Sequence, residues 1–214
     1  MAKAKIAKKE WYPILAPNMF KNTLLGETLV YGPEQIMGKS LTQNLMALTN
    51  DVKKQGINVS FEVVNVEKNT AHTDITGYKM VLSSIRRLVR RNVGKIDMSF
   101  ACTTSDGKNL RLKPLIITRM DIVSSIATKI RKNAQDYIVK HVSSSTYENF
   151  TNDLVSHKLQ EDLKKVLSKV YPLRICEIRS MEVITEKRPQ DESSKKAPKI
   201  NKVEEQKAVV EAAA

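Results

Sequence analysis

One short segment of this chain concentrates arginine, the residue whose side chain is best suited to holding phosphate groups. Residues 79–91 carry apolar side chains at the spacing of a helix that lies on a core, namely Val81, Leu82, Ile85, Leu88 and Val89. The other side of that helix would present only basic residues, namely Arg86, Arg87, Arg90 and Arg91. A guanidinium group donates two parallel hydrogen bonds to one phosphate. The pattern therefore predicts an anion-binding face, and the alternative interpretation is an ordinary solvated surface.

Further groups of basic residues accompany the arginine segment. The turn and the outward positions of an expected hairpin carry Lys108, Arg111 and Lys113. A third group consists of Arg119, Arg131 and Lys132, and the N-terminal arm contributes Lys3, Lys5, Lys8 and Lys9. We expect these side chains to neutralise the phosphates of a nucleic acid.

Trp11 and Tyr12 follow the basic arm and have two interpretations. Rings of this size usually bury themselves, so the pair would be a hydrophobic plug over the core. Alternatively, aromatics beside basic residues suit stacking on an RNA base, which makes Trp11 a candidate RNA-binding residue. The sequence also predicts an apolar outer surface around Met19 and Phe20, which is an alternative site of contact with a neighbouring protein.

The overall charge supports a polyanionic partner. The 214 residues carry 36 Lys and Arg against 23 Asp and Glu, a net charge of +13 and an isoelectric point near 9.7. A surplus of this size favours nucleic acid over membrane. No apolar run is long enough to cross a bilayer, and the basic N-terminus lacks the apolar stretch of a signal peptide. We therefore expect a cytoplasmic protein with no membrane partner.

Patterns for catalysis and metal binding are weak. Gly38-Lys39-Ser40 resembles the end of a phosphate-binding loop, but Pro33 stands where that loop needs glycine. The three histidines and the two cysteines, Cys102 and Cys176, lack ligand spacing. We predict no metal, no cofactor, no catalytic residue and no enzymatic activity. Two rival hypotheses are a free-standing RNA or DNA chaperone and a metal-dependent nucleic-acid enzyme that uses scattered carboxylates.

Periodicity predicts the elements that position these residues. Alternation predicts strands over 27–31, 59–66 and 71–76, and a hairpin of 96–102 and 110–116 around the turn 105–108. Residues 38–46 are ambiguous. The two prolines of 11–23 predict an irregular segment that is neither a helix nor a central strand.

The second half of the chain changes to a helical period. A stripe from Ile122 to Ile138 predicts a long helix from about 121, followed by one or two helices over 147–169 and a returning strand over 174–184. This order predicts an α+β fold with an antiparallel or mixed core flanked by amphipathic helices. We expect three regions: a basic arm and irregular apolar segment over 1–23, a single globular RNA-binding domain over 24–184, and an extended low-complexity tail over 185–214.

Several stretches together resemble one protein family. Lys9-Glu10-Trp11-Tyr12 followed by Ala16-Pro17-Asn18-Met19-Phe20 is similar to the opening of the S-three-a (S-one-e) family of small-subunit ribosomal proteins of archaea and eukaryotes. The resemblance continues through four more stretches over roughly residues 8–184. These are Gly26-Glu27-Thr28-Leu29-Val30, Thr103-Thr104-Ser105-Asp106-Gly107 with Leu110-Arg111-Leu112, Ile130-Arg131-Lys132, and Tyr171-Pro172-Leu173. The chain is shorter than eukaryotic members, which makes it look archaeal.

The resemblance implies a β-barrel-like core flanked by helices. It also implies a structural, non-enzymatic protein of the small ribosomal subunit. Such a protein would bind small-subunit rRNA on the platform, near the messenger exit and the 3′ end of that RNA. Neighbouring ribosomal proteins, and messenger RNA near the exit, would be further partners.

Overall fold

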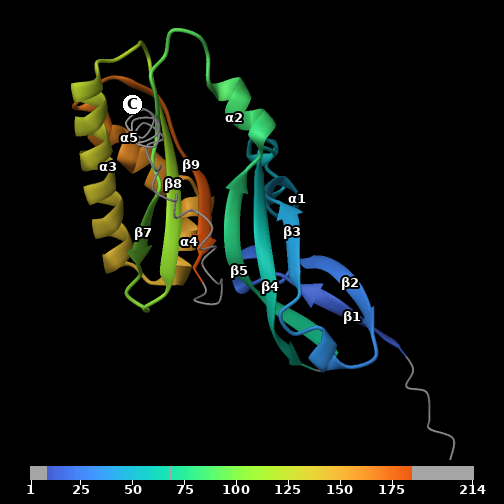
Figure 1. The fold of residues 1–214 in the computed structure, drawn as a ribbon. Coiled ribbons are helices and arrows are strands. Elements are labelled where there is room, and N and C mark those ends of the chain that lie inside the picture. Colours follow the sequence, from blue (N-terminus) through green and yellow to red (C-terminus); the bar gives the residue numbers. More distant parts are fainter. Residues whose placement is uncertain (1–8, 68, 185–214) are drawn as a thin grey trace, which may run out of the picture. The chain divides into compact units, whose positions relative to one another are not determined.

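The computed structural model describes residues 9–67 and 69–184 (Figure 1). Its strands are β1 (Glu10–Leu15), β2 (Leu24–Val30), β3 (Ser40–Asn44), β4 (Ile57–Glu67), β5 (Thr70–Met80), β6 (Lys95–Asp97), β7 (Phe100–Thr103), β8 (Asn109–Thr118) and β9 (Leu173–Val183). Its helices are α1 (Leu45–Thr49), α2 (Leu82–Leu88), α3 (Ser124–Ser144), α4 (Tyr147–Val155) and α5 (Lys158–Ser168), with short 3-10 turns η1 (Asn18–Phe20), η2 (Pro33–Gln35) and η3 (Val52–Lys54). The predicted tail, 185–214, lies outside the described residues.

The nine strands form one mixed sheet that branches at β5. The main path runs β2-β1-β5-β9-β8-β6, while β3 joins through β4 and β7 pairs with β8. β4 pairs with β5 along the full length of both strands. The other edge of β5 pairs with β1 in parallel at residues 71–72 and with β9 in antiparallel at residues 77–79. Among the described residues the sheet does not close into a barrel. The α+β prediction is confirmed, and so are the strands at β4 and β5. The predicted hairpin partner of β8 is divided, because residues 96–102 form two short strands, β6 and β7, that each pair with β8.

The helices α3, α4 and α5 bury one apolar stripe each in the main core. In α3 the stripe consists of Ile130, Ala134, Ile138 and Val142, at every fourth residue. Ile122 and Val123 precede this helix, which begins at Ser124, and Val123 is exposed, so the predicted stripe started too early. Thr146 follows α3 and caps α4, because its side chain accepts a hydrogen bond from the Asn149 N–H.

The segment 79–91 contradicts the prediction of one helix with four arginines on one side. Its first two residues belong to β5, and α2 ends at Leu88 because Val89 takes up an extended conformation. This exit lets Val89 and Val93 pack on a second small core around Ile85 and Leu115. Burial of those valines outweighs the remaining turn of helix, and Arg90 and Arg91 therefore follow the helix rather than lying on it.

The segment 11–23 is also more regular than its prolines predict. Residues 10–15 form β1, which lies between β2 and β5. Pro13 is tolerated because β5 pairs only with Ile14 and Leu15, which leaves the other edge of β1 unpaired at the proline. Phe20 packs edge-to-face on Phe61 in the core and is 5% exposed, so it does not belong to an outer apolar surface.

Gly94 joins the loop after α2 to the end of β8 and has no room for a side chain. A Cβ there would lie 2.8 Å from Thr118 Oγ1 and 2.9 Å from Ile122 Cγ1, and Thr118 Oγ1 itself accepts a hydrogen bond from the Gly94 N–H at 3.0 Å. We expect Gly94→Ala to lower the free energy of unfolding by about 1–3 kcal/mol. Urea unfolding measures this; Gly26→Ala, where a Cβ would meet nothing within 4 Å, should not destabilise. Equal effects of the two substitutions would contradict the steric argument.

Candidate nucleic-acid interface

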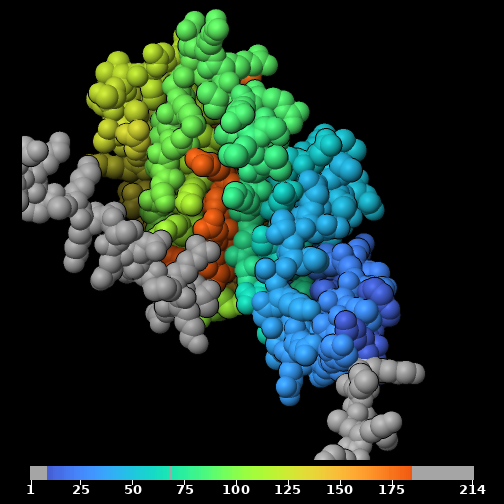
Figure 2. All heavy atoms as spheres, turned by 45° about the vertical axis from the view of Figure 1, so that its right-hand side comes forward, coloured from blue at the N-terminus to red at the C-terminus, as the bar shows by residue number. Residues whose placement is uncertain are grey.

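The four arginines of the segment 79–91 all reach solvent, although from two different local structures. Arg86 and Arg87 lie on α2, and Arg90 and Arg91 follow it. The Nε of Arg87 donates to the carbonyl of Ser83 at 3.3 Å, which holds its side chain along the helix. No ion pair within the described part of the chain involves any of the four. In Figure 2 the green surface in the upper part of the view includes this segment, and no other part of the described chain covers it there. Their guanidinium groups are thus available to an anion.

The hairpin group is partly engaged within the protein. Lys108 Nζ lies 4.4 Å from the centroid of the Tyr147 ring, a cation–π contact. Lys113 Nζ lies 4.0 Å from Glu182 Oε1 on β9, a strand whose pairing with β8 also places Glu182 opposite Arg111. The structure therefore places Lys108, Arg111 and Lys113 along one hairpin as predicted, with Glu182 offsetting part of their charge.

The third predicted group is divided by the fold. Arg119 lines an open groove of about 400 Å³ together with Lys164 of α5 and Arg174 of β9, and no acidic residue lines it. Arg131 and Lys132 are exposed in the middle of α3 and do not line this groove. Lys164 and Arg174 were not predicted to join Arg119, because they come from elements distant in the sequence. The Arg119 N–H donates to the Pro172 carbonyl at 3.3 Å, which joins the end of β8 to the start of β9.

The two aromatics of β1 face opposite ways. Tyr12 is 5% exposed and belongs to the core, whereas Trp11 is 61% exposed and pairs across the strands with Leu29. Alternation along the strand explains this split. The plug interpretation is confirmed for Tyr12 and wrong for Trp11. Lys9 is exposed beside this face with Nζ 5.0 Å from the Tyr31 ring centroid, while Lys3, Lys5 and Lys8 lie outside the described residues.

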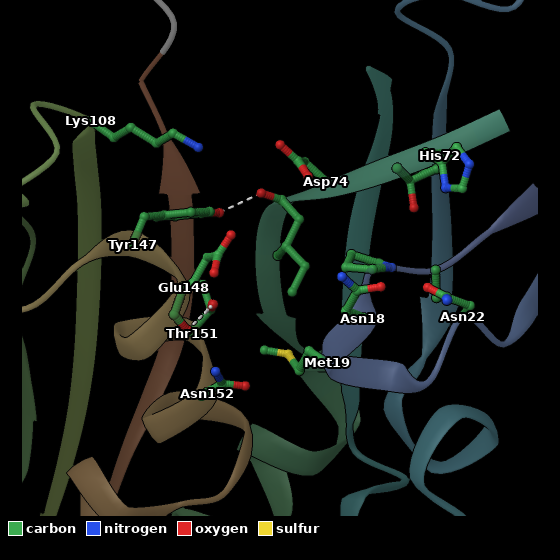
Figure 3. Close-up of a pocket in the computed structure, with 14 residues that line it drawn as sticks. Asn18, Met19, Asn22, His72, Asp74, Lys108, Tyr147, Glu148, Thr151 and Asn152 are labelled. Carbon is green, nitrogen blue, oxygen red and sulfur yellow. Dashed lines mark hydrogen bonds between the residues drawn. The ribbon is translucent and has the colours of Figure 1, made fainter. Parts of the chain in front are cut away.

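A polar cavity of about 410 Å³ lies between β5 and α4 (Figure 3). Lys108, Asp74 and Glu148 line it, so its charges are mixed. The Tyr147 hydroxyl donates to the Ile75 carbonyl at its edge. Two carboxylates against one lysine disfavour a phosphate, and the described residues contain no group of three His, Cys, Asp or Glu side chains placed to hold a metal ion. We therefore leave this cavity out of the basic interface.

A second cavity, of about 540 Å³, lies against α2 and is lined by Glu177 of β9 and by His157, the residue immediately before α5. His157 Nδ1 lies 3.6 Å from Glu177 Oε2. Burial raises the pKa of Glu177 to about 7, although the charge of Lys164 opposes this. Burial and the charge of Lys54 lower the pKa of His157. Both groups thus tend toward their uncharged forms near neutral pH, and their contact is not a strong ion pair. The only local signal for this site is an acidic residue amid the apolar residues of β9.

Comparisons with known proteins identify relatives over most of the chain. The sequence model of the ribosomal S3Ae family matches residues 1–187. A protein of Methanothrix thermoacetophila named small ribosomal subunit protein eS1 is 36% identical over 183 residues, which cover 85% of this chain and 87% of that protein. A protein of the same name from Saccharolobus islandicus is 32% identical over 182 residues, 85% of this chain and 88% of the relative.

The described helices include none with the length and apolarity needed to span a membrane.

The raised pKa of Glu177 predicts a pH-dependent stability. The folded protein binds this proton more tightly than the unfolded chain, whose carboxyl has its usual pKa of 4.5. The contribution of Glu177 to stability is therefore complete below pH 4.5 and is lost as the pH rises to about 7 and beyond. The Glu177→Gln variant has no such loss. Between pH 4.5 and 8 its free energy of unfolding should therefore rise relative to that of the wild type by an amount on the order of 3 kcal/mol.

Urea unfolding at a series of pH values measures the difference. His157 is present in both proteins, so its own titration largely cancels. The matched control is Glu62→Gln, an exposed carboxyl on β4, whose curve should stay parallel to that of the wild type. A Glu177→Gln curve that also stays parallel would contradict a buried, proton-binding carboxyl.

Proposed function

We propose that this chain, which belongs to the ribosomal S3Ae family, is a structural constituent of the small ribosomal subunit and binds the subunit's RNA through its basic surface. Two relatives carry the name of a small-subunit protein, and each is matched over most of its length, which supports the assignment of this chain to the small ribosomal subunit. The observation that carries the RNA contact is the set of solvent-facing arginines on and after α2, which no acidic side chain of the described residues pairs with.

The mechanism is recognition of the phosphate backbone. Each lysine or arginine that neutralises a phosphate releases condensed counterions, so the affinity falls steeply with salt. The shape of the folded RNA, rather than a base code, then selects the position. The proposed contacts are those of the basic groups and the exposed ring of Trp11, namely Lys3, Lys5, Lys8, Lys9, Trp11, Arg86, Arg87, Arg90, Arg91, Lys108, Arg111, Lys113, Arg119, Arg131 and Lys132. The groove adds Lys164 and Arg174 to Arg119.

The resemblance of the sequence supports a position on the platform, near the messenger exit and the 3′ end of the small-subunit RNA. Neighbouring ribosomal proteins are expected partners there, and messenger RNA is a further one. In this role the protein positions and stabilises folded RNA and performs no chemistry, which is why we propose a non-enzymatic function in the cytoplasm.

Reversal of two arginines tests the RNA contact. We expect Arg86→Glu with Arg90→Glu to weaken binding to small-subunit RNA at least tenfold and to reduce the slope of log affinity against log salt by about 2. The loss follows because two phosphate contacts become repulsive. Filter binding over a salt series measures both quantities, and sucrose-gradient sedimentation with immunoblotting measures incorporation into small subunits.

The matched control is Lys140→Glu with Lys158→Glu, which makes the same change in net charge at two exposed positions outside the proposed contacts. It should keep most of the affinity. Thermal unfolding of both double variants should stay close to that of the wild type, because all four side chains are exposed. A loss of stability that matches the loss of binding would assign the arginines a structural role instead. Absence of the wild-type chain from small subunits at every salt concentration would reject the proposed function.

A further inference from the structure

The cavity against α2 combines features that the backbone contacts above do not use. Its walls come from η3, the start of β4, the end of β5 and α2, with His157 and Glu177 completing the lining. Its volume of about 540 Å³ lies within the range of sites that hold small organic groups. Ile57, Met80 and Val81 give it apolar sides, whereas Lys53, Arg87, His157 and Glu177 supply charged or titratable groups.

Glu177 places an acceptor without a donor in this cavity. Its Oε2 atom is shielded from solvent and has no hydrogen-bond partner among the described residues. A buried acceptor without a partner is costly, and the cost is greater for a charged group. Burial favours the protonated form of Glu177 in the free chain, whereas hydrogen bonds donated by a ligand favour the charged carboxylate, so the site is matched to a ligand that donates hydrogen bonds.

His157 is held in a conformation that favours this placement. Its φ of 64° puts it in the left-handed region, which is uncommon for residues other than glycine, although histidine, asparagine and aspartate adopt it more often than the rest. Such strained residues are concentrated at functional sites. At this position the backbone turns from α4 into α5, and the imidazole lines the cavity within 3.6 Å of the Glu177 carboxylate.

The surrounding charges restrict the kind of ligand. Arg87 and Lys53 line the cavity, and the charge of Lys164 acts on Glu177. His157 is acted on by the positive charge of Lys54 and by the negative charges of Glu161 and Asp51, none of which lines the cavity. A lysine or arginine of another protein would be repelled by Arg87 and Lys53, whereas a bare phosphate group would satisfy these cations but offers Glu177 no pair of neighbouring donors. A ligand that offers neutral donors to Glu177 and carries negative charge toward Arg87 satisfies both conditions. A nucleotide has this combination.

We propose that this cavity receives one unpaired guanine of the small-subunit RNA, with the Glu177 carboxylate accepting from the base and Arg87 contacting its backbone. Guanine presents two adjacent donors, N1–H and the N2 amino group, which match the two oxygens of a carboxylate. The other bases offer no such pair of neighbouring donors. Unpaired bases that leave the stack are the usual targets of sequence-specific RNA recognition. This inference rests on the proposed function and adds a base-specific contact to it.

Chemical probing of intact small subunits tests the inference. Subunits are isolated from cells in which the wild-type chain or its Glu177→Gln variant is the only source of this protein. A dicarbonyl reagent that attacks guanine N1 and N2 then modifies the RNA. We expect one guanine to be protected in wild-type subunits and to become roughly tenfold more reactive with Glu177→Gln, because an amide cannot accept at both positions. Glu62→Gln should leave its protection unchanged.

Occupancy of the chain in each subunit preparation, measured by quantitative immunoblotting, separates the possible failures. If the variant chain is present at wild-type occupancy and no guanine changes, the inference is overturned while the proposed function stands. A change at adenine, cytosine or uracil, or a chemical crosslink from Glu177 to another protein, also overturns it. Absence of the wild-type chain from the subunits rejects both hypotheses.

A second variant covers the case in which Glu177→Gln is not incorporated. His157→Asn removes the imidazole wall, and asparagine tolerates the left-handed backbone at this position. It should expose the same guanine. If subunits that contain His157→Asn protect that guanine as well as wild-type subunits do, the proposed cavity is not its binding site.

Discussion

The backbone pairing of β5 is the constraint on which the rest of the structure depends. Along one edge this strand pairs with β4, and along the other it pairs with β1 at residues 71–72 and with β9 at residues 77–79. Three pairs of residues thus join the N-terminal strands to β9, and the Tyr147 hydroxyl reinforces the junction by donating to the Ile75 carbonyl. Because α2 follows β5 after one residue, this junction also determines where the arginines stand and closes the cavity between α2 and Glu177.

The arginines on and after α2 contribute little to folding, which is consistent with a role outside the chain. Arg86, Arg87, Arg90 and Arg91 are exposed, and burial of Ile85, Leu88 and Val89 is what holds their segment in place. The groove at Arg119 gathers like charges from the end of β8, α5 and the start of β9 without an acidic neighbour in its lining. Such an arrangement gains stability when an anion enters, because mutual repulsion is then replaced by attraction. An RNA that carries one negative charge per nucleotide supplies this at several places at once.

Local pattern predicted the elements whose periodicity is uninterrupted. Alternation identified β4, β5 and the β7–β8 hairpin, and a four-residue spacing identified α3, because in each case one face is buried along much of the element. Prediction failed where distant contacts decided the outcome. Pro13 lies in a strand because β5 pairs beyond it, and α2 is short because Val89 and Val93 reach a second core. Lys164, Arg174 and Glu177 joined the candidate sites only through the packing of α5 and β9, which no local spacing encodes.

The cavity at Glu177 shows how a structural protein can retain features that weaken it in isolation. A carboxylate oxygen without a donor and a histidine in the left-handed region both oppose folding of the free chain. An aliphatic residue at 177 and a glycine at 157 would relieve both costs while keeping β9 and the turn into α5. Selection for stability alone would favour those residues. Their absence from this sequence is explained if the relevant state is the chain bound in a particle, where a ligand that donates hydrogen bonds restores the missing partners.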